Sequence, residues 1–347
     1  MLKAKGYAAH HKSDQLAPWN FERRDPGPQD VVVEILYSGI CHSDIHQVRD
    51  EWGGSMYPMV PGHEIVGRVT AVGSAVKKFK IGDIAGVGVM IDSCRKCKNC
   101  KKNLEQYCEE GMTGTYNAKE RDGVTLAQGG YANNIVTDER YVYTVSPSLD
   151  LKGVGPLLCA GITTYSPLRY AKVGKGMKVG VIGLGGLGHL GVKFAVSFGA
   201  EVTLISTSPS KKADADRLGA HKFLLSTDQA QMKENYGYFD VLLNTVSARH
   251  SYNDYMPLLD LDGQMLIVGL PPEDPQLSPG TLIFKRRSIT GSMIGGTTET
   301  QEMLDYCAEK NIVADVEVIP ISYVNEAYER IIKSDVKYRF VIDMATI

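Results

Sequence analysis

The sequence has little that would mark a membrane-embedded, secreted or nucleic-acid-binding protein. No apolar run approaches the roughly 18 residues that a membrane-spanning helix requires. Residues 1–14 are polar and lack the apolar segment of a secretory signal. The 38 lysines and arginines are balanced by 40 aspartates and glutamates, and the net charge of −2 offers no basic surface for nucleic acid or an anionic membrane. We therefore expect a cytoplasmic protein that binds neither.

The chain also lacks internal repeats and low-complexity segments, and its 347 residues suggest two domains. Before about residue 150, short β-type runs such as 31–36 and 65–72 alternate with turns rich in proline and glycine. Later, short apolar runs that read as buried strands are separated by helical patterns; these runs are 178–182, 202–205, 239–243 and 265–268. This alternation is typical of a doubly wound parallel sheet, so the fold class is α/β with a β-rich first part.

A glycine-rich loop follows the first of these later strands and opens a helical pattern. Its sequence has the form G-x-G-x-x-G and consists of Gly183, Leu184, Gly185, Gly186, Leu187 and Gly188. Glycine permits the tight turn and lets the backbone approach a pyrophosphate, which the amino end of the following helix then faces. Because of this strand–loop–helix context we predict a dinucleotide site; a tight turn without a ligand is the alternative.

The second strand ends without the carboxylate that an NAD site places there for the ribose 2′-hydroxyl. Hydroxyl and ammonium groups occur instead, on Ser206, Thr207, Ser208, Lys211 and Lys212. A 2′-phosphate suits such donors and would be repelled by a carboxylate, so we predict NADP(H). The alternative for the two lysines is a solvated helix face.

Four of the seven cysteines form one cluster: Cys94, Cys97, Cys100 and Cys108. Four thiolates suit tetrahedral zinc, and a site filled by protein ligands leaves no position for a substrate. An iron–sulfur cluster is the alternative, but ferredoxin-type sequences use other spacings. We therefore predict a structural zinc.

Three further residues are candidates for a second zinc site, namely Cys41, His63 and Cys159. Any one of them alone could be an inert core residue. Together, two thiolates and an imidazole leave one open position on a tetrahedral zinc, as catalysis requires. We predict a catalytic zinc here and assign Cys307, within a helical pattern, to the core.

With these motifs the chain resembles the zinc-dependent medium-chain alcohol dehydrogenases. Residues 62–67, with Gly73 and Val76, match that family's signature G-H-E-x2-G-x5-G-x2-V, and the resemblance extends over essentially the whole chain. Within the family the chain is most similar to the cinnamyl-alcohol-dehydrogenase-like branch, which includes bacterial broad-range NADPH-dependent aldehyde reductases. Residues 41–46 and 158–164 carry this narrower match.

The resemblance implies a GroES-like catalytic domain from residues 1–151 and 291–347, with a Rossmann cofactor domain over 152–290 between them. It implies that Glu64 is an alternate or nearby ligand of the catalytic zinc, and that the protein is a homodimer. It also implies further cofactor contacts from Thr163, Thr245, Gly269, Ser292, Met293 and Ile294.

The expected activity is interconversion of primary alcohols and aldehydes, aromatic or medium aliphatic, with aldehyde reduction favoured. A histidine of ordinary pKa could not remove an alcohol proton unaided, so the metal is expected to acidify the hydroxyl. We assign Ser43 as the first proton relay and His46 as the exit toward solvent. Many plant relatives have threonine where this chain has Ser43, which keeps the hydroxyl. The alternatives are a polyol or secondary-alcohol dehydrogenase of the same fold, and a non-catalytic protein that binds NADPH and zinc.

Overall fold

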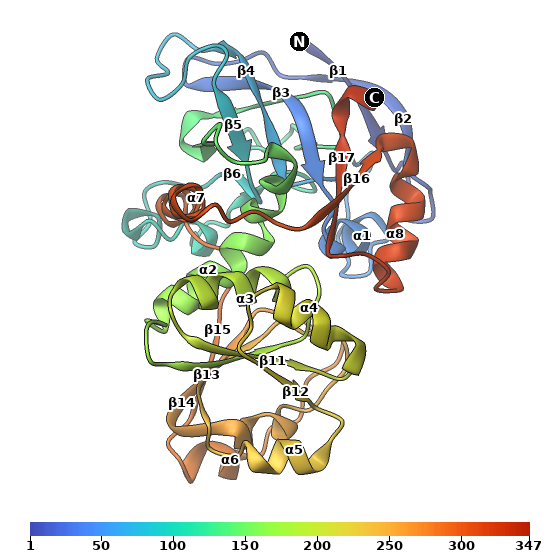
Figure 1. The fold of residues 1–347 in the computed structure, drawn as a ribbon. Coiled ribbons are helices and arrows are strands. Elements are labelled where there is room, and N and C mark those ends of the chain that lie inside the picture. Colours follow the sequence, from blue (N-terminus) through green and yellow to red (C-terminus); the bar gives the residue numbers. More distant parts are fainter. The chain divides into compact units, whose positions relative to one another are not determined.

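The computed structural model describes residues 1–347 and divides them into two compact units. Unit 1 contains Met1–Ile162 and Gly295–Ile347, and unit 2 contains Thr163–Ile294. Both termini therefore belong to unit 1 (Figure 1). The domain boundaries expected from the sequence lie at 151/152 and 290/291, and they remain a prediction.

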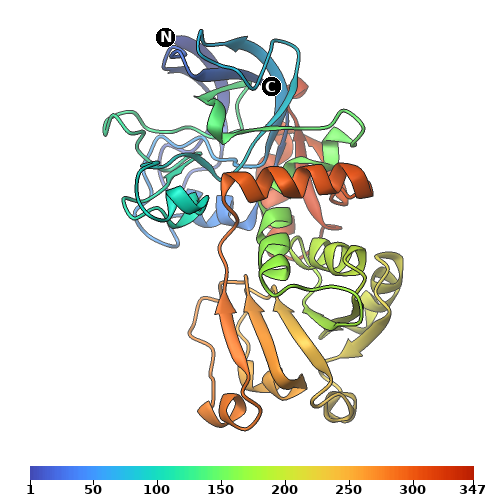
Figure 2. The same cartoon turned by 90° about the vertical axis from the view of Figure 1, so that its left-hand side faces the viewer.

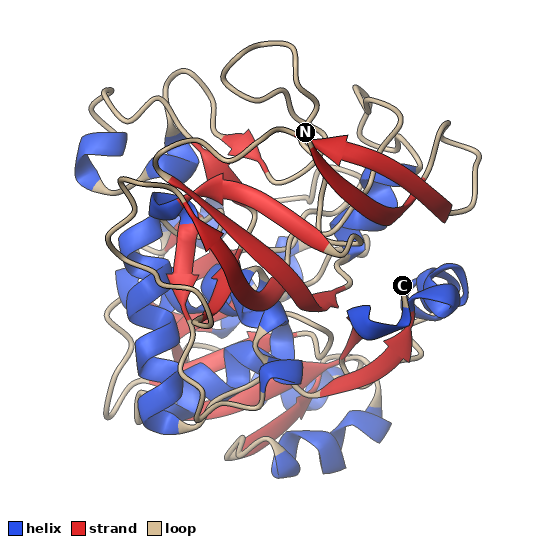
Figure 3. Ribbon diagram, turned by 90° about the horizontal axis from the view of Figure 1, so that it is seen from above, coloured by secondary structure: helices blue, strands red, loops and turns tan.

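Unit 1 is built mainly of short antiparallel strands. Its strands before the insertion are β1 (Leu2–Ala8), β2 (Ala17–Arg23), β3 (Asp30–Gly39), β4 (Ile65–Val72), β5 (Ile84–Val87), β6 (Met90–Asp92), β7 (Thr113–Gly114), β8 (Asn134–Asp138) and β9 (Val142–Thr144). The β1–β2 hairpin starts at the amino terminus, and Figure 3 shows these strands as red arrows. The buried runs of β3 and β4 follow from their valine- and isoleucine-rich sequences.

The end of the chain completes this sheet. After the insertion come α7 (Thr297–Lys310), which Figure 2 shows lengthwise, then β16 (Val316–Pro320), α8 (Val324–Ile332) and β17 (Arg339–Asp343). The strand order is β16-β17-β3-β4-β5-β9, with β8 also paired to β3. Because β17 pairs antiparallel with β3 at Tyr37–Gly39, the last strand lies directly beside the segment that leads to α1 (His42–Val48).

Unit 2 is a six-stranded parallel sheet with helices between its strands. Its strands are β10 (Lys178–Ile182), β11 (Glu201–Ser206), β12 (Lys222–Leu225), β13 (Phe239–Asn244), β14 (Leu259–Ile267) and β15 (Ser288–Gly291). Their spatial order is β12-β11-β10-β13-β14-β15, the order of a doubly wound dinucleotide-binding sheet. The neighbours of β10 are thus β11 and β13. The strands after β10 are added first on one side of it, as β11 and β12, and then on its other side, from β13 to β15.

The helices of unit 2 are short. They are α2 (Ala160–Tyr170), which begins in unit 1, α3 (Gly188–Ser197), α4 (Lys212–Arg217), α5 (Gln229–Glu234) and α6 (Pro279–Ile283). Figures 1 and 2 show α2, α3 and α4 gathered on one side of the sheet. No helix of the chain combines the length and apolarity needed to cross a bilayer. Cys307, predicted as core, is fully buried on α7.

Candidate functional site

The first candidate site lies in unit 1, where three separate segments bring metal-binding atoms together. Cys41 is the amino cap of α1, His63 and Glu64 directly precede β4, and Cys159 follows a short 3-10 helix. One ligand atom from each of the four lies within 4.8 Å of all the others. The two sulfurs are 3.9 Å apart, although the cysteines are separated by 118 positions in the chain. The structure therefore unites the residues that the sequence singled out.

Asp44 orients the imidazole of this cluster. Its Oδ1 atom lies 3.1 Å from Nδ1 of His63, and both side chains are buried. A carboxylate can only accept, so Nδ1 carries a proton and Nε2 is the ring nitrogen that would bind a metal. Sequence analysis did not identify Asp44, because no spacing along the chain shows which buried group its carboxylate contacts.

Burial, charge and hydrogen bonds shift the pKa values of this cluster in different directions. Burial acts to lower the pKa of His63, but the charge and hydrogen bond of Asp44 outweigh it, and the net pKa lies well above its ordinary value. The hydrogen bond from Cys159 lowers the pKa of the Cys41 thiol well below its usual range, with Arg339 and His63 adding to the effect. The same hydrogen bond, together with burial, raises the pKa of Cys159. Of the two thiols, Cys41 is thus the more acidic.

Glu64 forms a buried ion pair with Arg339, the first residue of β17. Nη2 of Arg339 donates to Oε1 of Glu64, and neither residue is more than 7% exposed. Burial raises the pKa of Glu64 to about 7, although Arg339 opposes the rise. Oε2 of Glu64 is buried and has no hydrogen-bond partner. Sequence analysis could not find Arg339, because 275 positions separate it from Glu64.

These donors fit a zinc ion. Two sulfurs, one imidazole nitrogen and one oxygen of Glu64 converge in one place, and these are the ligand types that zinc prefers in proteins. An uncompensated carboxylate oxygen is costly to bury, and a cation beside it would remove that cost.

Ser43 and His46 both lie on α1, which begins directly after Cys41. Nδ1 of His46 hydrogen-bonds to Oε2 of Glu51, and its ring stacks on Trp52 with the ring centres 4.7 Å apart. The His46 side chain is 27% exposed, so it has access to solvent. Glu51 is a further residue that sequence analysis did not identify, since a charge after a short helix usually means only a solvated surface.

The second candidate site is the four-cysteine loop, in which one sulfur from each of Cys94, Cys97, Cys100 and Cys108 lies within 4.8 Å of the others. All seven cysteines of the chain are free. Backbone amides of Cys94, Cys97 and Cys100 each donate to a sulfur of the loop at 3.3–3.4 Å. The amide of Cys100 is the main reason that the pKa of Cys97 falls to about 6. Four sulfurs that converge in this way fit one tetrahedral zinc.

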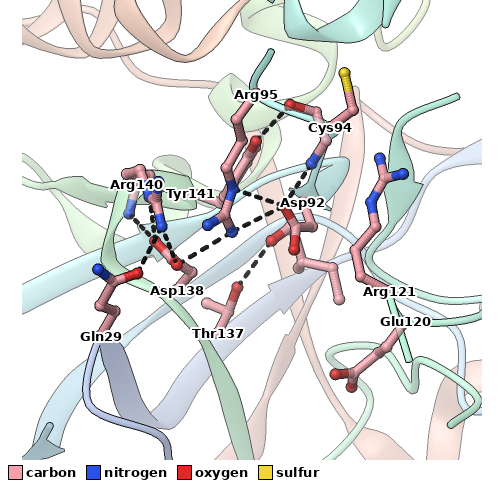
Figure 4. A network of polar contacts seen from close by, with 12 residues as sticks. Gln29, Asp92, Cys94, Arg95, Glu120, Arg121, Thr137, Asp138, Arg140 and Tyr141 are labelled. Carbon is pink, nitrogen blue, oxygen red and sulfur yellow. Dashed lines mark hydrogen bonds and ion pairs between the residues drawn. The ribbon is translucent and has the colours of Figure 1, made fainter. Parts of the chain in front are cut away.

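Charged and polar side chains anchor this loop to the rest of unit 1 (Figure 4). Nε of Arg95 donates to Asp92 at 3.0 Å, and its Nη2 lies 3.1 Å from Asp138, which also binds Arg140. The Arg95 guanidinium lies 5.7 Å from the ring centre of Tyr141. The contacts of Arg95 therefore hold the loop in place, in addition to the hydrogen bonds to its sulfurs.

The third candidate site is the glycine loop of unit 2, which joins β10 to α3. Gly183 has a φ of +91°, which favours glycine. A Cβ at Gly188 would lie 2.1 Å from the carbonyl oxygen of Gly183, so the helix can approach the strand this closely only with glycine there. A Cβ at Gly185 would meet nothing within 4 Å, so this part of the loop is open. Gly186 and Leu187 complete the turn, and Leu184 lies at its start.

The residues expected at a 2′-phosphate follow the neighbouring strand. Ser206 ends β11, and Ile205 pairs in register with Ile182 of β10, so the two loops leave the same edge of the sheet. The Ser206 hydroxyl accepts from the amide of Ser208 at 3.2 Å, which makes a tight turn through Thr207. Lys211 lies in a 3-10 turn, and Lys212 begins α4.

Most of the remaining predicted cofactor residues follow the carboxyl ends of the other strands. Thr245 comes after β13 and donates to the Ile182 carbonyl at 2.8 Å. Gly269 comes shortly after β14, where a Cβ would lie 2.3 Å from the carbonyl oxygen of Val246. Ser292, Met293 and Ile294 follow β15, whereas Thr163 lies on α2 and is 8% exposed. In parallel sheets of this order, ligands bind at this carboxyl edge.

Comparisons with known proteins agree with this arrangement. Residues 27–147 match the alcohol dehydrogenase GroES-like domain, and residues 186–309 match the zinc-binding dehydrogenase family. The chain is 52% identical to the aldehyde reductase YahK of Escherichia coli K12 over all of this chain and 99% of the other. It is 53% identical to a probable mannitol dehydrogenase of Fragaria ananassa, covering 99% and 95% of the two chains.

A solved structure is similar over the whole chain as well. CAD from Helicobacter pylori in complex with NADP(H) is 44% identical, with a TM-score of 0.93 and 99% of each chain covered. The predicted fold class, a GroES-like β-rich part with a Rossmann sheet, is thereby confirmed. The chain belongs to the family of zinc-dependent alcohol dehydrogenases.

Proposed function

We propose that the protein is a zinc-dependent oxidoreductase that interconverts primary alcohols and aldehydes with NADP(H), favouring reduction of aromatic or medium aliphatic aldehydes. The observation that carries the proposal is the convergence of Cys41, His63 and Cys159, because these three ligands would leave a fourth position for a substrate oxygen whenever Glu64 does not occupy it. A non-catalytic binding protein would have no use for that open position.

In this proposal Cys41, His63 and Cys159 hold the catalytic zinc, and Glu64 replaces or assists a ligand when the site opens. The four-cysteine loop holds a second, structural zinc. When bound, zinc polarises a carbonyl oxygen and lowers the pKa of a hydroxyl, and NADPH provides a hydride. Side chains of the protein hold the ligands in position. Asp44 keeps the proton on Nδ1 of His63, and Arg339 holds one oxygen of Glu64.

Proton transfer is assigned to α1. The Ser43 hydroxyl would pass a proton between the substrate oxygen and His46, whose ring exchanges it with solvent. Glu51 supports His46 in this role, since its carboxylate accepts from Nδ1 and so holds the orientation of the ring. The partial exposure of His46 supports its place at the outer end of the relay.

The loops at the carboxyl edge of the unit 2 sheet would hold NADP(H). The amides of the glycine loop and the amino end of α3 would face the pyrophosphate. The hydroxyls of Ser206, Thr207 and Ser208, with Lys211 and Lys212, would take the 2′-phosphate. The similar protein from Helicobacter pylori, solved with NADP(H), supports this assignment.

We also propose that the protein is a cytoplasmic homodimer joined through unit 2. Its seven free cysteines suit a reducing compartment. β15 is the last strand of its sheet, and large apolar side chains of unit 2 are exposed nearby in the chain, with Phe284 88% exposed. Leu261, Leu270 and Ile283 are also exposed. Replacing Phe284 with aspartate should give monomers in light scattering; an unchanged mass would contradict this interface.

The experiment that tests the activity combines metal analysis with a substrate panel. We expect two zinc ions per chain and oxidation of NADPH with benzaldehyde and medium aliphatic aldehydes. Reduced nicotinamide formed fastest with mannitol would instead favour a polyol dehydrogenase, a possibility raised by the Fragaria relative. One zinc per chain and no turnover would refute the catalytic assignment.

A further inference from the structure

Tyr131 is a fully buried tyrosine whose hydroxyl reaches the polar residues behind the first cluster. It comes from the segment before β8 and is 0% exposed. Its hydroxyl donates to Oδ2 of Asp44 at 3.1 Å. Its amide donates to the Pro61 carbonyl at 2.9 Å, and a Cβ at Gly62 would lie 2.6 Å from its ring. Tyr131 is thus packed against the two residues that precede His63.

The contacts of Asp44 show what this hydroxyl contributes. Oδ1 accepts from the Gly62 amide at 3.2 Å and from Nδ1 of His63 at 3.1 Å. Oδ2 accepts from the Cys41 amide at 2.8 Å and from Tyr131. A carboxylate has about four acceptor positions, and these four donors fill them. Without the Tyr131 hydroxyl, Oδ2 would lose one of these donors, and the carboxylate would be held less firmly.

We infer that Tyr131 is a positioning residue for the metal centre, acting through Asp44 on both His63 and Cys41. A carboxylate held by four donors cannot turn, so it fixes the plane of the imidazole and the start of α1 at the same time. This inference rests on the proposed role of Cys41, His63 and Cys159 as zinc ligands. Partners that hydrogen-bond directly to a ligand, as Asp44 does, commonly change metal affinity by about 10–100-fold when removed, and for Tyr131, which acts through Asp44, we expect the lower end of this range.

The four-cysteine loop offers a matched control. Tyr141 is also buried, at 2% exposure, and its hydroxyl donates to Oγ of Ser93 at 2.7 Å. Ser93 Oγ lies 3.2 Å from the sulfur of Cys100. Each tyrosine therefore reaches a different cysteine cluster through one intervening side chain. Removing one hydroxyl should affect only the cluster to which it is connected.

The test compares Tyr131→Phe, Tyr141→Phe and the unaltered chain, each loaded with zinc. Zinc release into excess chelator is followed with a chromogenic indicator, and each phase is assigned with Cys41→Ser and Cys97→Ser. We expect Tyr131→Phe to speed release from the Cys41 cluster by about ten-fold and to leave the other phase unchanged. Tyr141→Phe should speed release from the four-cysteine loop and leave the phase of the Cys41 cluster unchanged. Absorption spectra of the cobalt-substituted proteins should change at the same cluster in each variant.

Four results would overturn the inference. Release from the Cys41 cluster at the unaltered rate in Tyr131→Phe would show that the hydroxyl holds nothing in place. Equal acceleration of both phases, or a Tyr131→Phe chain that does not fold, would show a general structural role instead. A single zinc in the unaltered chain would refute the proposed catalytic site itself, and this outcome is visible before any variant is made.

Discussion

The two cysteine clusters of unit 1 hold metal-binding atoms equally close together but are assembled differently. Cys94, Cys97, Cys100 and Cys108 lie on one loop, whose own amides donate to its sulfurs. The other cluster takes Cys41 and Cys159 from positions 118 residues apart, and its buried partners come from α1 and β17. A local loop can organise itself around a metal, whereas the dispersed cluster depends on the folded sheet. We therefore expect that losing the metal of the four-cysteine loop affects stability, and that losing the metal of the dispersed cluster affects activity.

The largest effect is expected from breaking one ligand in each cluster. Cys41→Ser should reduce aldehyde reduction by more than about 100-fold and zinc from two to one per chain, because the reacting oxygen loses its Lewis acid. Cys97→Ser should also remove one zinc, but it should lower the melting temperature by about 5 °C or more. The reason is that the free energy of zinc binding in the four-cysteine loop contributes to the free energy of folding. Metal analysis, kinetics and thermal denaturation of both variants check this. A large fall in melting temperature for Cys41→Ser alone would reverse the comparison.

Within the dispersed cluster, the relay can be separated from the metal. Ser43→Ala should lower kcat by about 100-fold, the usual size of a lost proton-transfer step, while the zinc content stays at the unaltered value. Ser43→Thr keeps the hydroxyl and should restore most of the activity. Steady-state kinetics beside metal analysis measures this. Unchanged turnover in Ser43→Ala would remove Ser43 from the relay.

A smaller effect is expected at the proposed 2′-phosphate site. Replacing both Lys211 and Lys212 with alanine should raise KM for NADPH by about ten-fold, since charge-assisted contacts to phosphate are lost. The KM for NADH should change little, because NADH has no 2′-phosphate. Kinetics with each cofactor tests this. A clear preference of the unaltered enzyme for NADH would contradict the assignment.

The smallest effect concerns the link between the four-cysteine loop and α7. Glu105 follows Cys100 in that loop, and its carboxylate accepts from the amide and hydroxyl of Thr297 at 3.0 and 3.2 Å. It thereby caps α7, whose own cap residue, Gly296, has no side chain to do so. Glu105→Gln should cost about 1 kcal/mol, or a few degrees in melting temperature.

The control for this link is the loop without its zinc. If the metal holds Glu105 in place, Glu105→Gln should destabilise the Cys97→Ser chain less than the unaltered one. Fully additive losses in a double-variant cycle would show that the cap is independent of the metal.

Local features were predictable from sequence because short-range geometry dictates them. The spacing of the four cysteines can close a loop around one ion, and the glycine loop can form only one kind of turn between a strand and a helix. The hydroxyls and lysines after β11 could be assigned to a 2′-phosphate from their position at the end of a strand alone. Cys41, His63 and Cys159 were selected partly through the family resemblance, since single residues carry little pattern of their own.

What the sequence by itself determined is therefore the parallel sheet, its nucleotide loop and the self-contained cysteine loop. Only the tertiary structure decided the surroundings of the dispersed cluster, where Asp44, Tyr131 and Arg339 meet. Pairing of β17 with β3 brings Arg339 to Glu64 from the far end of the chain. Contacts of this kind depend on which buried polar groups the folded sheet leaves to satisfy one another, and no spacing along the chain encodes that.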